Sequence, residues 1–154
     1  MLKKYYAIYV LILFLFVVDR FLKYIFLNHP DFFQGYFDDI LSFHFEKNTG
    51  IAFGLALNQT LVVALTIVII YILISILISF YKKGLGLEYF SLTLIIVGAI
   101  SNLIDRLRYG YVVDYIDVKF FSVFNIADSM ITIGIILIVI KELLFKKSWA
   151  NVER

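Results

Sequence analysis

Four long apolar stretches alternate with more polar segments along the chain, at about residues 5–27, 61–81, 87–107 and 124–145. About 20 mainly apolar residues cross the hydrocarbon core of a bilayer as a helix, because each residue adds about 1.5 Å. A backbone in lipid must satisfy its own hydrogen bonds, so helices are expected even where Ile, Val and Phe would favour strands in water. The pattern predicts a bundle of four transmembrane helices.

Two connections, at about residues 28–60 and 108–123, join the predicted helices on one side of the membrane. Within the longer one, residues 40–45 have strand-like composition. Turn residues bracket this stretch, Asp38 and Asp39 before it and Asn48-Thr49-Gly50 after it. We therefore expect a small extracytoplasmic β-sheet cradle on the membrane surface.

Basic residues at the opposite helix ends predict the orientation of the bundle. They are Lys3, Lys4, Lys82, Lys83, Lys146, Lys147 and Arg154. Because basic residues favour the cytoplasmic side, both termini are expected inside and both connections outside. No small-residue cleavage site follows the first apolar stretch, so it is expected to be a retained helix and not a removed leader.

The composition narrows the class of protein further. Of 154 residues, 62% are hydrophobic and 17% are charged. The hydrophobic share is higher, and the charged share lower, than in a typical soluble domain. This composition fits a single integral membrane domain over residues 1–154. A net charge of +2 gives no indication of nucleic-acid binding. Cysteine is absent and only His29 and His44 offer imidazole, so neither a thiol nucleophile nor a metal or cofactor is expected.

The strongly polar residues of the predicted helices gather near one level, at their outer ends. They are Asp19 and Lys23 in the first helix, Asn102, Asp105 and Arg106 in the third, and Asn125 and Asp128 in the fourth. Ionisable groups are costly at membrane depth and commonly face a bundle interior or a wet cavity. Spacings of three or four residues place each set on one helix face. Together they predict a functional site at the outer membrane surface.

Each set also has a purely structural interpretation. Asp19 and Lys23 could form an interfacial ion pair in which the lysine reaches towards the headgroups. Asp105 and Arg106 could simply end a helix, and Asn125 and Asp128 could be its cap and first-turn acid. His44 is expected to be an ordinary sheet residue. Aromatic residues expected at the membrane interface are Tyr5, Tyr6, Tyr109, Tyr111 and Tyr115.

Asp114, in the shorter connection, and Asp128 are the acids best placed to meet. Two carboxylates held close together share one proton near neutral pH, because ionising both is costly. One then takes a proton from water while the other donates a proton to a scissile carbonyl oxygen. This is the chemistry of an aspartic peptidase, and partial burial would help it operate near pH 7.

Several motifs occur in a fixed order over nearly the whole chain. They are NTGIAFG at 48–54, GAISNLIDR at 98–106, GYVVDYI at 110–116, FNIAD at 124–128 and the D-x-x-x-K spacing of Asp19 and Lys23. Jointly they resemble the bacterial lipoprotein signal peptidase (signal peptidase II) family. One departure is Val97, where members often have glycine.

The resemblance implies a four-helix enzyme of the bacterial inner membrane that removes the signal peptide from diacylglyceryl-modified prolipoproteins, just before the lipidated cysteine. It implies that Asp114 and Asp128 are the catalytic dyad. Residues implied to support the site or contact substrate are Asp19, Lys23, Asn48, Gly54, Asn102, Arg106 and Asn125. We expect a monomer whose partners are these prolipoproteins and membrane lipid.

Three other functions are compatible with parts of the pattern. Intramembrane acids also mark ion or proton transporters, but the middles of the second and fourth helices are almost wholly apolar. Ser122 and Lys119 would be the only nearby pair for a Ser-Lys peptidase. A non-enzymatic assembly factor could use the polar cluster to bind a partner helix.

Overall fold

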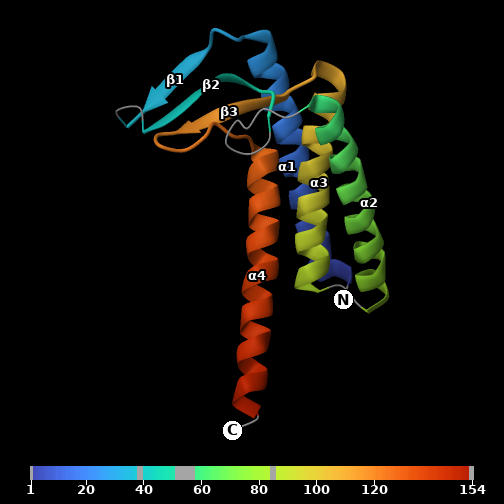
Figure 1. Ribbon diagram of the computed structural model, residues 1–154. Coiled ribbons are helices and arrows are strands. Elements are labelled where there is room, and N and C mark those ends of the chain that lie inside the picture. Colours follow the sequence, from blue (N-terminus) through green and yellow to red (C-terminus); the bar gives the residue numbers. More distant parts are fainter. Residues whose placement is uncertain (1, 38–39, 51–57, 84–85, 153–154) are drawn as a thin grey trace.

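The computed structural model describes residues 2–37, 40–50, 58–83 and 86–152, which form four helices and three strands. The helices are α1 (Leu2–Asn28), α2 (Gln59–Lys83), α3 (Leu87–Tyr109) and α4 (Ile126–Val152). The strands are β1 (Phe33–Tyr36), β2 (Leu41–Asn48) and β3 (Val112–Val118). The sheet lies at one end of the helices, and the start of α1 and the end of α4 point towards the other (Figure 1).

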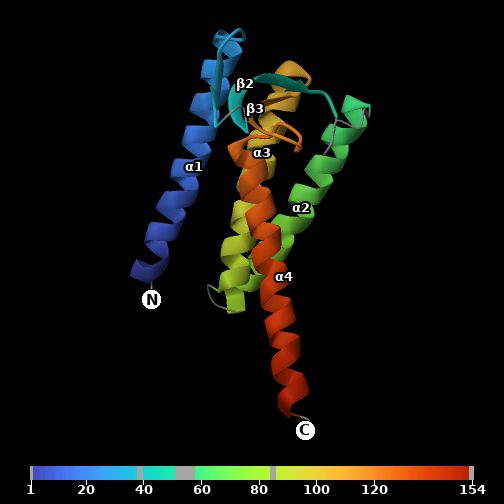
Figure 2. The same ribbon diagram turned by 90° about the vertical axis from the view of Figure 1, so that its left-hand side faces the viewer.

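The four helices coincide with the four predicted apolar stretches and extend a few residues beyond most of their ends. α3 contacts each of the other three helices and lies between them (Figure 2). Gln59–Phe80 and Leu87–Tyr109 are long and apolar enough to cross a membrane. α1 and α4, of 27 residues each, also exceed the roughly 20 residues that a membrane-spanning helix needs. The predicted four-helix membrane fold is confirmed.

The predicted sheet is also confirmed, and it is larger than expected. The three strands are antiparallel in the order β1-β2-β3, with Glu46 of β2 opposite Asp114 of β3. β3 lies in the segment 108–123, which the sequence indicated only as a loop. Residues 112–115 are all buried, so the strand lacks the alternation of apolar and polar residues that would have revealed it.

Two apolar clusters hold the sheet and helices together. Ile12, Leu94 and Met130 form the first, between α1, α3 and α4, and Val97 packs against it. The second joins α1 to β3 and includes Phe26 and Tyr115, whose rings stack with centroids 5.2 Å apart. Tyr115 is completely buried, so its predicted place at the membrane interface is wrong. It lies on the side of β3 that α1 covers.

Two glycines allow α3 and α4 to approach closely. A Cβ atom on Gly98 would lie 2.5 Å from the carbonyl oxygen of Ala127, and one on Gly134 would lie 2.7 Å from the carbonyl oxygen of Ser91. Real Cβ atoms do not approach backbone this closely, so larger residues would force the helices apart. The contact at Gly98 lies beside Asp128 and fixes the position of the first turn of α4.

Three features singled out in the sequence lie outside the described residues. They are the acidic turn Asp38–Asp39, residues 51–54 of the NTGIAFG motif and, among these, the candidate site residue Gly54.

Candidate active site

Asp114 and Asp128 are brought together through Asn125, the residue that precedes α4. The Asn125 side-chain amide donates to Oδ1 of Asp114 at 2.6 Å, and its backbone N–H donates to Oδ2 of Asp128 at 3.2 Å. The remaining carboxylate oxygens accept from other asparagines. Asn48 donates to Asp114 at 2.9 Å, and Asn102 donates to Asp128 at 2.7 Å. Both acids are thus oriented by amide donors.

The surroundings of Asp114 change its ionisation. Burial, followed by the charge of Asp128, raises the pKa of Asp114 from 3.8 to about 7. Hydrogen bonds from Asn48 and Asn125 and the charge of Lys23 act in the opposite direction, but less strongly. Asp114 can therefore hold or release a proton near neutral pH, as the predicted acid pair requires.

Lys23 lies at the centre of a fully buried polar cluster next to this pair. Its ammonium contacts Oδ2 of Asp19 at 3.0 Å and Oδ2 of Asp105 at 2.9 Å, and donates to Oδ1 of Asn102 at 2.8 Å. The side chains of Lys23, Asp19 and Asp105 are 0% exposed. The alternative of a lysine reaching towards the headgroups is therefore wrong. These three contacts use all three ammonium donors inside the protein.

Asp19 connects α1 to the other elements that form the site. Its carboxylate accepts hydrogen bonds from Ser101 of α3 at 2.6 Å, the Tyr115 hydroxyl of β3 at 3.0 Å and the backbone N–H of Ala127 in α4 at 3.2 Å. These bonds fix α1, α3, β3 and α4 relative to one another. Asp19 is thus a support for the site and lies at its base.

Four residues of this network were not among the candidate site residues: Arg20, Ser101, Asp105 and Tyr115. Asp105 had been placed at the polar level, yet a helix end explained it equally well. In the structure it is 0% exposed and pairs with both Lys23 and Arg20. The helical spacing between Asn102 and Asp105 was the available signal, because it puts both on the same side of α3.

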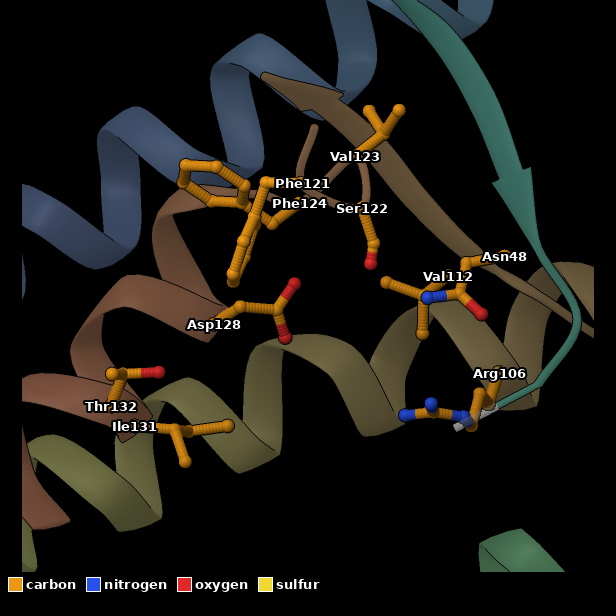
Figure 3. A pocket seen from close by; sticks show the side chains of 10 residues that line it. All are labelled: Asn48, Arg106, Val112, Phe121, Ser122, Val123, Phe124, Asp128, Ile131 and Thr132. Carbon is orange, nitrogen blue, oxygen red and sulfur yellow. The ribbon is translucent and has the colours of Figure 1, made fainter. Parts of the chain in front are cut away.

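Two adjoining cavities open beside the acids. The first has a volume of about 340 Å³, and Asp128 and Arg106 point into it from α4 and α3 (Figure 3). The second, of about 270 Å³, is lined by Asp114. Asn48, Ser122 and Val123 border both, so the cavity at Asp128 adjoins the cavity at Asp114.

The guanidinium of Arg106 lies at the first cavity and is held by one hydrogen bond to the backbone. One terminal nitrogen donates to the carbonyl oxygen of Gly50 at 3.2 Å. Its Nε is buried and has no hydrogen-bond partner among the residues that the structure describes. The guanidinium points into the cavity, so its terminal nitrogens can donate to a polar group of a ligand that enters it (Figure 3).

His44 lies in β2 as expected, near Ser42 and Asp117 on the sheet. Across the described part of the chain, no three His, Asp or Glu side chains are grouped so that they could hold a metal ion.

The fold and the acid pair define a class, the membrane aspartic peptidases. A family model described as Peptidase_A8, signal peptidase (SPase) II, matches residues 11–144. The lipoprotein signal peptidase of Buchnera aphidicola subsp. Schizaphis graminum is 40% identical over 92% of this chain and 97% of its own length. That of Halothermothrix orenii is 36% identical over 86% of this chain and 92% of its own length. The chain belongs to the signal peptidase II family.

Solved structures agree with this assignment. A bacterial membrane enzyme determined by the in meso method at 2.3 Å resolution superposes with a TM-score of 0.80 at 30% identity, covering 92% of this chain and 90% of that one. A second, at 1.9 Å resolution, gives a TM-score of 0.72 at 29% identity and covers 89% and 92%.

Proposed function

We propose that this protein removes signal peptides from diacylglyceryl-modified prolipoproteins by cutting just before the lipidated cysteine, with Asp114 and Asp128 as the catalytic dyad. The observation that carries the proposal is the arrangement around Asn125, which holds one carboxylate with its side chain and the other with its backbone N–H. Family membership supports the reaction class, and each acid lines one of the two adjoining cavities, which a peptide could enter.

The proposed reaction uses one proton shared by the two carboxylates. The ionised member takes a proton from a water molecule, and the oxygen of that water attacks the scissile carbonyl carbon. The protonated member donates to the carbonyl oxygen, giving a tetrahedral intermediate. Its collapse breaks the C–N bond as a proton is returned to the leaving amine. Because burial and the charge of Asp128 raise the pKa of Asp114 to about 7, the pair can hold one proton near neutral pH.

The remaining candidate residues divide into two roles. Asn48, Asn102 and Asn125 orient the acids through the hydrogen bonds described above, and Asp19 and Lys23 fix the elements from which those acids project. Arg106 is proposed to bind a carbonyl group of the substrate through the guanidinium that it points into the first cavity. A close approach of the peptide backbone to Gly54 stays a prediction, since that residue lies outside the described structure.

The cellular arrangement is proposed from the same features. We place both termini in the cytoplasm and the sheet at the outer face of a bacterial inner membrane, because the basic helix ends lie opposite the sheet. The acids lie where the sheet meets the helices. A lipidated cysteine at the outer membrane surface could therefore reach them while its acyl chains stay in the bilayer. We propose that the protein works as a monomer without a cofactor.

The Ser-Lys alternative gains no support from the site. The Lys119 ammonium lies over the ring of Phe120 at 5.8 Å from its centroid. Within the described residues, no hydrogen bond joins Lys119 to Ser122. A serine nucleophile needs a base within hydrogen-bond reach, and this pair does not supply one.

The test is cleavage of a diacylglyceryl-modified prolipoprotein by purified protein in detergent, with a chelator present. Wild type should cut before the lipidated cysteine and should leave the same precursor uncut when its cysteine carries no lipid. Asp114→Asn and Asp128→Asn should each lose activity while keeping the wild-type thermal unfolding profile. Asp117→Asn, on the same strand and outside the pair, is the matched control. Full activity in either dyad variant, or loss of cleavage on adding chelator, would refute the proposal.

A further inference from the structure

Arg20 is a charged side chain of α1 that belongs to the polar network but has no part in the reaction proposed above. One of its terminal nitrogens lies 2.5 Å from Oδ1 of Asp105 and donates to the carbonyl oxygen of Ser101 at 3.2 Å. Its side chain is 22% exposed, whereas that of Asp105 is 0% exposed. Arg20 therefore reaches from the edge of the bundle to a buried carboxylate in α3.

The buried cluster is electrically balanced only when Arg20 is included. Asp19, Asp105 and Lys23 are all fully buried, and together they carry two negative charges and one positive charge. An uncompensated charge is costly in a site of this kind, where water is excluded. Arg20 brings the net charge of the cluster to zero.

The cluster is linked to the acid pair by two hydrogen bonds through a single residue. Lys23 donates to Oδ1 of Asn102 at 2.8 Å, and Nδ2 of Asn102 donates to Oδ1 of Asp128 at 2.7 Å. Lys23 thus fixes which end of the Asn102 amide faces the acid. Without Arg20, Lys23 would be the one cation in direct contact with Asp105 among the described residues, and it would pair with two carboxylates.

We propose that Arg20 is a positioning residue that balances the charge of the buried cluster and so sets the pH range in which the acid pair works. It acts through Asp105, Lys23 and Asn102 and does not itself touch substrate. This inference rests on the proposed function, because it takes Asp114 and Asp128 as the catalytic pair.

Charged groups face the pair from every element that surrounds it. They are Asp19 and Lys23 from α1, Asp105 and Arg106 from α3, and Glu46, opposite Asp114, and Lys47 from β2. Glu46 and Lys47 are exposed, so water screens them, while the cluster of α1 and α3 is buried. A change of one charge in that cluster should therefore act on the pair more strongly than a change on β2.

The experiment measures kcat/KM against pH with a lipid-modified precursor in detergent. Arg20→Gln leaves an extra negative charge, which makes loss of the shared proton harder, so the profile should move to higher pH by about half a unit to one unit. Asp105→Asn leaves an extra positive charge and should move it to lower pH. The double variant Arg20→Gln/Asp105→Asn restores neutrality and should return the profile towards wild type. Arg20→Lys keeps the charge and should stay near wild type.

Arg108→Gln is the matched control, because Arg108 is an exposed arginine at the end of α3 that lies over the ring of Tyr109. It should leave the profile in place. If Arg20→Gln lowers activity equally at every pH, or moves the profile in the same direction as Asp105→Asn, Arg20 has only a structural role and the inference is wrong. If Arg20→Gln does not fold, Asp105→Asn and the double variant still test the charge balance.

The same assay separates this inference from the proposed function. Inactive Asp114→Asn and Asp128→Asn with an unmoved Arg20→Gln profile would overturn the inference and leave the dyad in place. Active dyad variants would overturn both.

Discussion

Asn125 and Asp128 cap the start of α4 reciprocally. The Asn125 side-chain oxygen accepts the backbone N–H of Asp128 at 2.8 Å, and the Asp128 carboxylate accepts the backbone N–H of Asn125 at 3.2 Å. This is the geometry of a capping box, with aspartate in the place usually held by glutamate or glutamine. Asn125 and Asp128 are therefore both the cap of a helix and members of the candidate active site. The cap that begins the helix also fixes the proposed catalytic carboxylate.

Serine at position 125 should separate these two roles. Serine can still cap the helix, but it cannot donate an amide hydrogen bond to Asp114. We expect Asn125→Ser to lose about 1–3 kcal/mol of stability, because buried oxygens of Asn102, Val113 and Asp114 lose a donor. Its kcat, assayed well below the unfolding temperature, should fall by about tenfold or more. Asn125→Ala also loses the helix cap and should be less stable than Asn125→Ser by about 1 kcal/mol. Equal kcat for wild type and Asn125→Ser would show that Asn125 serves only as a cap.

The raised pKa of Asp114 predicts a pH-dependent stability. Between 3.8 and about 7 the folded state keeps a proton that the unfolded chain has released, so folding loses stability as the pH rises through this range and changes little above it. Asp114→Asn removes this titration. The unfolding free energy of the variant relative to wild type should therefore become more favourable from pH 5 to pH 8, by about 2–3 kcal/mol.

Thermal unfolding in detergent at both pH values would measure this difference. Any constant cost of the new amide cancels, because it is the same at both pH values. Asp31→Asn, at an exposed position, is the control and should differ from wild type equally at pH 5 and pH 8. A difference between Asp114→Asn and wild type that is the same at pH 5 and pH 8, or that moves against the variant as the pH rises, would mean that the pKa of Asp114 is not raised.

The hydroxyl group of Tyr115 should contribute to the stability of the protein. It donates to Asp19 at 3.0 Å and accepts the backbone N–H of Ile126 at 3.2 Å. Burial, and then the charge of Asp19, raise the pKa of Tyr115, so the hydroxyl stays a donor at any physiological pH. Tyr115→Phe leaves both partners one bond short inside the protein and should cost about 1–3 kcal/mol of stability. Tyr24→Phe, at an exposed position on α1, should cost almost nothing in the same unfolding assay.

The sequence pattern was sufficient to predict the four helices, because the length and hydrophobicity of a stretch determine whether it can cross a membrane as a helix. A lipid-exposed helix needs an uninterrupted apolar stretch, and the chain has four. The strands β1 and β3 were not predicted, for two reasons. β1 has only four residues, FQGY, with glycine among them. β3 is buried on both faces in its first half, so its composition does not alternate.

Residues of the candidate site could be predicted where they lie at the outer ends of the predicted helices and also belong to a motif. Asn102, Asn125 and Asp128 were candidates on both grounds, whereas Asp114 and Asn48 lie in the connections between helices and Asn48 was a candidate only through its motif. Arg20 and Tyr115 were not candidates, because their roles depend on which neighbours surround them once the helices pack. Tyr115 has the composition of an interfacial aromatic residue, and only the packing of β3 against α1 shows that its hydroxyl faces Asp19. Pairings between distant segments, such as Arg20 with Asp105, do not appear in the spacing along one helix.

The contact between Gly98 and Ala127 predicts that helix packing controls catalysis. Gly98→Ala would place a Cβ atom against the backbone of the residue that precedes Asp128, and backbone cannot move aside as a side chain can. We expect a loss of about 1–3 kcal/mol of stability from overpacking and a fall in kcat of about tenfold, because α4 would shift the carboxylate. Gly134→Ala meets Ser91 and Ile95 at a similar distance but further along α4. It is the matched control, since it should lose comparable stability yet keep a kcat near wild type when assayed well below its unfolding temperature. Equal losses of kcat in the two variants would show that Gly98 affects activity only through overall stability.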